Sequence, residues 1–182
     1  ALGLGISIKT RSPNETMPLL DRLLVAVKQT VNQLPDSQFG QPSPDQHLSL
    51  GEFGFHIFRI AQRTFEEGDG ISIGLLPLEN PISSTSPHNA FETFNDIVEF
   101  GDFVLHEYRD WVGQNNNIEM LGQTLGKGAG LRSGADQLDI IAGHTTQHLR
   151  QLYLVLDKLG ITPVNKVPDS ELPPEYVLTL LS

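Results

Sequence analysis

Apolar side chains recur at steps of three and four residues in four stretches of the chain, which is the period of an α-helix with one face turned toward a core. We expect these helices at about residues 18–34, 50–67, 90–112 and 135–159. Pro18 suits a first helical turn. Four helices of this length, with almost no convincing strand pattern, predict an all-α protein built as an antiparallel four-helix bundle.

Two local signals support the helix ends. Ser49, followed three residues later by Glu52, has the pattern of a capping box at the start of the second helix. Gly160 follows the last apolar position of the fourth helix, with Pro163 just beyond, which is the usual order of residues at a helix end. These signals place the boundaries of the second and fourth helices more firmly than periodicity alone.

Long polar connectors separate the later helices. They span about 68–89 and 113–133 and are rich in glycine, asparagine, serine and proline. Loops of this length often form the lid or the wall of a site. We expect a single domain over residues 1–182, with a core at about 17–163 and a C-terminal tail at 164–182.

Composition narrows the classes of function. The chain carries 22 acidic and 12 basic residues, a net charge of −10. Such a field repels phosphate backbones and anionic lipids, so neither nucleic acid nor a membrane is expected as a partner. No apolar run has the length of a membrane span and no secretory signal is visible, so a cytoplasmic protein is expected. The absence of cysteine excludes disulfides, thiolate metal sites and cysteine nucleophiles.

Two of the six histidines lie four residues apart on the fourth helix. His144 and His148 therefore share one face of that helix, with Ile141 and Val155, and both imidazoles are expected to point inward. This spacing lets two imidazoles reach one metal ion with bonds of about 2.1 Å. Two inward imidazoles one turn apart are hard to explain by packing alone.

A third histidine lies on the apolar face of the second helix. His56 falls between Phe53 and Ile60 on that face. A single buried histidine is more often a satisfied core residue than a metal ligand. Together with the inward pair on the fourth helix, however, it completes three neutral imidazoles, a known ligand set for zinc or a similar divalent ion with one open position.

The other three histidines are expected outside this site. His106 lies on the acidic side of the third helix, His47 precedes the capping box, and His88 lies in the long connector, where it could belong to a lid. Their surroundings indicate solvent exposure and not metal binding.

Two polar residues lie one helical turn from the expected ligands. Glu52 could act as a general base or as a hydrogen-bond partner of a ligand, although capping the helix is a sufficient explanation for it. Gln151 could orient a bound water or a ligand, or could simply form a hydrogen bond between helices. Both are candidate catalytic residues.

This arrangement of histidines resembles the DinB-like superfamily. The matching segments are GEFGFHIFRIAQRTF around His56 and AGHTTQHLRQLYLVLDKLGITP around His144 and His148. The resemblance extends over about residues 17–163. It implies a four-helix bundle with a three-histidine site for a divalent metal, commonly nickel or zinc, and it assigns the ligands to these three histidines.

The resemblance also implies a function. Several relatives look like transferases or isomerases that use bacillithiol, mycothiol or glutathione, and members are frequently dimeric. We therefore expect a homodimeric metal-dependent enzyme. It would be either a thiol S-transferase that acts on a small electrophilic substrate, with the thiol supplied by a low-molecular-weight cofactor, or a hydrolase. One alternative is a non-catalytic metal-binding bundle. Another is an interaction protein that uses the acidic third helix without a metal.

Overall fold

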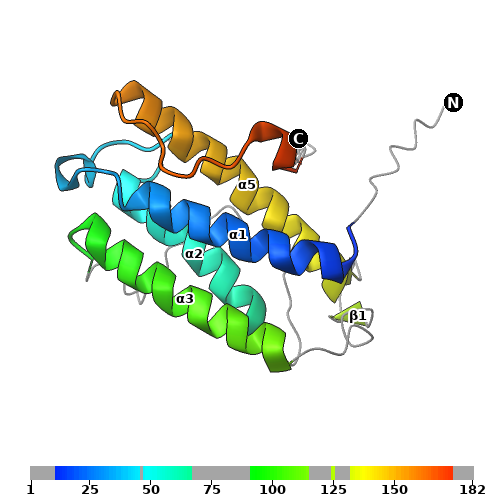
Figure 1. Cartoon of the computed structure of the whole chain (residues 1–182). Coiled ribbons are helices and arrows are strands. Elements are labelled where there is room, and N and C mark those ends of the chain that lie inside the picture. Colours follow the sequence, from blue (N-terminus) through cyan, green and yellow to red (C-terminus); the bar gives the residue numbers. More distant parts are fainter. Residues whose placement is uncertain (1–10, 46, 67–90, 115–123, 126–131, 174–182) are drawn as a thin grey trace, which may run out of the picture.

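A computed structural model describes residues 11–45, 47–66, 91–114, 124–125 and 132–173. This part of the chain forms four long helices, together with two short 3₁₀ helices and a ladder of two-residue strands (Figure 1). The long helices are α1 (Pro13–Val31), α2 (Leu50–Glu66), α3 (Phe94–Gln114) and α5 (Gly134–Lys158). The short elements are η1 (Asp36–Gln38), β1 (Thr124–Leu125), β2 (Arg132–Ser133) and η3 (Asp169–Glu171). The predicted all-α four-helix bundle is confirmed.

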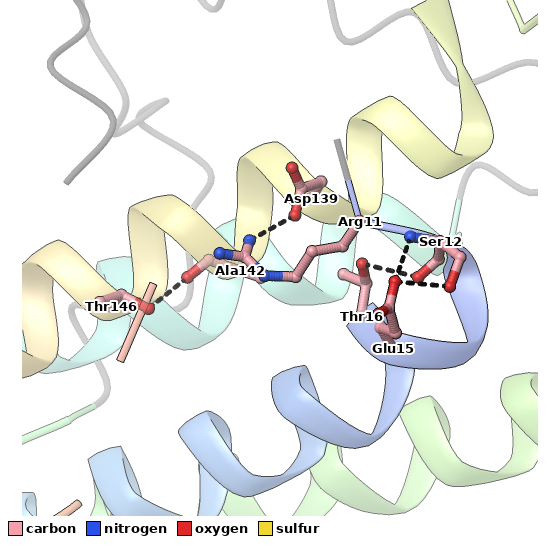
Figure 2. A network of polar contacts seen from close by, with 7 residues as sticks. All are labelled: Arg11, Ser12, Glu15, Thr16, Asp139, Ala142 and Thr146. Atoms are coloured by element: carbon pink, nitrogen blue, oxygen red, sulfur yellow. Dashed lines mark hydrogen bonds and ion pairs between the residues drawn. The ribbon is translucent and has the colours of Figure 1, made fainter. Parts of the chain in front are cut away.

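Helix α1 begins more than one turn before the expected position. The backbone N–H of Ser12 donates to the carboxylate of Glu15 at 2.9 Å, and the Thr16 hydroxyl donates to the Ser12 carbonyl (Figure 2). Pro13 follows as the first helical residue, where its missing N–H costs nothing. Pro18 therefore lies inside the helix and not in its first turn, so the expected start was wrong.

The boundaries of α2 and α5 agree with the prediction to within one residue. The Ser49–Glu52 capping box is present, with the Ser49 N–H donating to Glu52 Oε2 at 2.7 Å and the Glu52 N–H donating to Ser49 Oγ at 3.2 Å. Gly160 has a φ of 70°, and the next N–H, of Ile161, returns to the Leu156 carbonyl at 2.9 Å. This pattern closes α5 as glycine at a helix end usually does.

Helix α3 begins four residues later than expected. The Asp96 carboxylate accepts hydrogen bonds from the N–H groups of Glu92 and Thr93, and the Asp96 N–H donates back to Thr93 Oγ1. These bonds satisfy donors that a helix start leaves without a partner. The helix consequently starts at Phe94 and not near residue 90.

Contacts at both ends show that α1 and α5 run in the same direction. Arg11, just before α1, pairs with Asp139 near the start of α5. Gln33, just after α1, donates to the Thr162 carbonyl beyond the end of α5 at 2.9 Å. The same ends of the two helices are therefore adjacent, as Figure 1 also shows.

Helices α2 and α3 also run in the same direction. Early in both helices, a Cβ atom on Gly54 would lie 3.2 Å from the Ile97 side chain. Later in both, Gln62 donates to the carboxylate of Glu107 at 3.1 Å. The expected antiparallel order therefore holds between α2 and α5 and between α1 and α3. It does not hold between α1 and α5 or between α2 and α3, which run in parallel. Residues 67–93 join the end of α2 to the start of α3 at the other end of the bundle, and a long connection permits this parallel order.

The segment after α5 turns back along the bundle (Figure 1). Val167 and Leu172 are buried in the core, and the Val167 N–H donates to the hydroxyl of Tyr153 at 3.0 Å. Glu171 pairs with Arg22 of α1. Residues 164–173, part of the expected tail, thus pack on α1 and α5. None of the described helices is both long and apolar enough to cross a membrane.

Candidate metal centre

Three histidines from two helices converge inside the bundle. The His56 ring on α2 lies 5.4 Å, centroid to centroid, from both His144 and His148 on α5. The two α5 rings are 4.2 Å apart. Each histidine offers one ring nitrogen, and these three nitrogens all lie within 4.8 Å of one another. The structure therefore brings together the three residues that the sequence singled out as ligands.

Helix packing explains why these rings meet. The fully buried Phe53, one turn before His56, packs edge-on against the ring of His148 at 4.9 Å. Because α2 and α5 run in opposite directions, the next turn of α2 then lies beside His144. The helical spacing within each segment and the opposite directions of the helices are together sufficient to form the cluster.

A hydrogen bond orients His148. Its Nδ1–H donates to Gln151 Oε1 at 2.7 Å. The other nitrogen, Nε2, then keeps its lone pair and lies 2.9 Å from Nε2 of His144. Fixing a ligand ring through its second nitrogen is common in metal sites, because it selects the tautomer and the direction of the lone pair. Gln151, a candidate from sequence, thus contacts the cluster directly.

The residues present fit a divalent ion. An ion with tetrahedral bonds of about 2.1 Å holds its nitrogen ligands roughly 3.4 Å apart, so side-chain movements on the order of 1 Å complete the arrangement. His144 Nδ1 is buried and has no hydrogen-bond partner among the described residues. A satisfied core histidine would bond through both ring nitrogens. This orphaned atom argues against packing as the only role of the cluster.

Burial keeps the three rings neutral. It lowers the pKa of His56 from 6.5 to about 4, and the adjacent His148 adds to the decrease. Burial also lowers the pKa of His144 well below its usual value, and it lowers that of His148, where the bond to Gln151 acts in the opposite direction. Near pH 7 all three imidazoles are therefore in the form that binds metal ions.

The charge of an unexpected residue, Asp45, reaches the cluster. Its carboxylate acts on both His56 and His148 and partly offsets the effect of burial on the pKa of each. Asp45 lies in the loop before α2. Side-chain directions in a loop follow no periodic pattern, so the sequence does not predict that the charge of Asp45 reaches the cluster. Glu52, the acidic candidate from sequence, uses its carboxylate to accept the Ser49 N–H at the start of α2.

The remaining histidines lie apart from the site or outside the described residues. His106 is exposed on α3, with Nε2 3.3 Å from a carboxylate oxygen of Asp110. His47 is exposed in the loop before α2. His88 falls outside the part of the chain that the structure describes.

Comparison with known proteins found no family model, no curated protein and no solved structure that matches the chain. The resemblance to the DinB-like superfamily therefore rests on the histidine segments themselves.

Proposed function

We propose that this protein binds a divalent metal ion, nickel or zinc, through His56, His144 and His148. The convergence of three neutral imidazoles from α2 and α5 is the observation that supports the proposal. Such an ion lowers the pKa of a bound water or thiol and so supplies a nucleophile near neutral pH.

We further propose that the protein is a DinB-like enzyme that transfers a low-molecular-weight thiol to a small electrophile. The chain's own residues hold and shield the reacting group. Gln151 fixes the His148 ring, and Phe53 covers one side of the cluster and excludes water there. His56 and His144 keep part of their surface accessible, which leaves a side from which a substrate can approach. Because the chain has no cysteine, the thiol comes from a cofactor.

Metal analysis of untagged protein tests the ligand assignment. We expect about one equivalent of nickel or zinc in the wild-type chain. The amount should fall to a small fraction in His144→Ala. His106→Ala, which removes an exposed histidine on α3, is the matched control and should keep the metal. Equal metal content in wild type and His144→Ala would reject the assignment.

A non-catalytic metal-binding bundle is the second candidate. Its supporting observation is the burial of the cluster among core residues such as Phe53, which suits an ion that stabilises the fold. An assay of S-transfer from several thiols to an aryl halide separates the candidates. Turnover that His144→Ala abolishes supports the enzyme. No turnover with any thiol, together with a large rise in melting temperature on adding zinc, supports the bundle.

We include a homodimer and a cytoplasmic location in the proposal. The dimer follows from the same resemblance, and sedimentation velocity at several protein concentrations tests it. A monomer at all concentrations would contradict it without affecting the metal assignment.

A further inference from the structure

An open groove lies between the first half of α1 and the last turns of α3. Helix α1 lines one side of it, from Asn14 to Asp21, and α3 lines the other side, from Tyr108 to Val112. No histidine is among the lining residues, so the groove is separate from the histidine cluster. Its volume is about 260 Å³. A cavity of roughly 150 Å³ is large enough to bind benzene, so the groove has room for one small ring.

The base of the groove is apolar and held in place. Tyr108 is 1% exposed, and its hydroxyl donates to the Met17 carbonyl at 2.8 Å, which ties the ring to α1. Trp111 stacks on the Tyr108 ring, with the two centroids 6.3 Å apart. Met17 and Val112 are partly exposed and add aliphatic surface. Such a surface favours a flat apolar ligand, which gains free energy by leaving water and packing against a fixed aromatic ring.

Pro18 gives the groove a hydrogen-bond acceptor. In an α-helix the N–H of residue 18 would donate to the carbonyl of Asn14. Proline has no N–H, so this bond cannot form in α1. The Asn14 carbonyl points along the helix toward Pro18, and both residues line the groove. A ligand in the groove can therefore supply the donor that the helix lacks at this point.

The charged groups at the groove neutralise each other. Arg109 donates to both carboxylate oxygens of Asp21, from Nε at 2.7 Å and from Nη2 at 3.1 Å. A pair of this bidentate geometry satisfies both partners and offers no net charge to a ligand. An ion would lose hydration in the groove without gaining a counter-charge, so the groove favours a neutral ligand.

We propose that the groove between α1 and α3 binds a small neutral aromatic molecule with one hydrogen-bond donor, of the phenol or indole type. The ring of the ligand packs on Tyr108 and Val112, and its donor meets the Asn14 carbonyl. The inference does not rest on the proposed metal binding, because the two sites share no residue.

NMR titration of the full chain with phenol, toluene and benzoate tests each part of the proposal. Toluene lacks the donor, and benzoate carries a charge. Pro18→Ala restores an N–H for the Asn14 carbonyl and keeps α1 helical, because alanine is the best helix former. Pro13→Ala is the matched control, because Pro13 is the first residue of α1 and does not line the groove. Val112→Trp fills the groove.

In the wild type we expect phenol to bind about fivefold or more tightly than toluene or benzoate, because only phenol is both neutral and a donor. Pro18→Ala should raise the phenol Kd to that of toluene, Pro13→Ala should leave it unchanged, and Val112→Trp should weaken the binding of both.

Equal Kd values for phenol and toluene in the wild type would overturn the inference, as would a phenol Kd that Pro18→Ala does not change. Phenol-induced shifts that lie outside the groove, or that persist in Val112→Trp, would also overturn it.

Discussion

His148 is the most constrained residue of the cluster. Its ring is bonded to Gln151 through Nδ1, lies beside His144 Nε2, and packs against Phe53. With both nitrogens and one edge in contact with neighbours, the ring has little freedom to turn. Gln151 therefore positions the His148 ring, and the proposed metal binding should depend on it.

Replacing Gln151 tests this role. Gln151→Leu removes the acceptor and keeps a similar volume, so the His148 ring loses its fixed tautomer, and we expect the zinc Kd to rise about 10- to 100-fold. Gln147→Leu, on an exposed position of α5, is the matched control. Equal Kd values for the two variants, measured by chelator competition, would show that Gln151 does not position the ligand.

The depressed pKa values predict an acid-sensitive metal-free protein. The folded state holds His56 neutral down to a pKa of about 4, whereas the unfolded chain takes up a proton near 6.5. Stability is therefore fully present above pH 6.5 and is lost as the pH falls toward 4.

Urea unfolding in the presence of a chelator measures this effect. Between pH 7 and pH 5 we expect His56 to contribute a loss of roughly 1–2 kcal/mol in the free energy of unfolding. His56→Gln should show a smaller loss over the same range. A wild-type free energy of unfolding that does not change with pH would contradict the neutral buried ring.

At the residue scale, the sequence predicts the three clustered histidines but not their surroundings. All three histidines lie on helices, where the period of 3.6 residues determines which side chains share a face. Gln151 is predictable for the same reason. Asp45 lies in a loop. The path of that loop depends on backbone hydrogen bonds such as the one between the Ser43 N–H and the Leu48 carbonyl, and no sequence periodicity predicts such bonds.

At the scale of the elements, helix starts depend on caps more than on apolar periodicity. Residues 50 and 160 are predicted well because the adjacent cap residues are recognisable in sequence. The start of α1 is missed because Pro18 is compatible with a first turn, while the Ser12–Glu15 box that starts the helix precedes the apolar pattern. Local hydrogen bonds therefore decide boundaries that the hydrophobic pattern leaves open.

An ion pair with a buried carboxylate and a partly exposed guanidinium ties the start of α1 to α5. Arg11 reaches across to Asp139, at 2.6 Å (Figure 2), and Asp139 is only 1% exposed. Arg11→Met leaves this carboxylate without its guanidinium, and we expect a loss of roughly 2–3 kcal/mol in stability. Arg22→Met breaks the exposed pair with Glu171 and should cost less than about 1 kcal/mol. Urea unfolding of both variants gives the comparison, and equal losses would contradict the importance of burial.

Close packing of α2 on α3 predicts that alanine affects stability differently at two glycines of α3. A Cβ atom on Gly101 would lie 2.6 Å from the ring of Phe58, which is fully buried and has little room to move. We expect Gly101→Ala to destabilise the protein by roughly 1–3 kcal/mol. Gly113→Ala, also on α3 but with nothing within 4 Å of the added atom, should be neutral or stabilising, because alanine favours helix. Thermal unfolding that ranks the two variants in the opposite order would contradict this packing.

At the scale of the whole molecule, the bundle's topology is less predictable than its architecture. Apolar periodicity shows which face of each helix is buried, but the same face can pack with the helix pointing either way. The order in which α1 and α5 share one direction, and α2 and α3 the other, depends on long connections such as 67–93, whose length is compatible with either direction. The bundle is therefore predicted from the sequence, and its helix directions are not.

The helix directions nevertheless determine the site. The antiparallel packing of α2 against α5 places His56 beside both His144 and His148. A parallel arrangement of these two helices would reverse the order of Phe53 and His56 along α5. The histidine cluster is thus a property of the whole bundle and not of either helix alone.

Anomalous scattering from crystals grown with zinc and without a chelator locates any bound ion relative to the three histidines. We expect one strong peak about 2.1 Å from a ring nitrogen of each of His56, His144 and His148. No peak at these rings, or a peak that the His56 ring does not reach, would contradict the proposed metal binding.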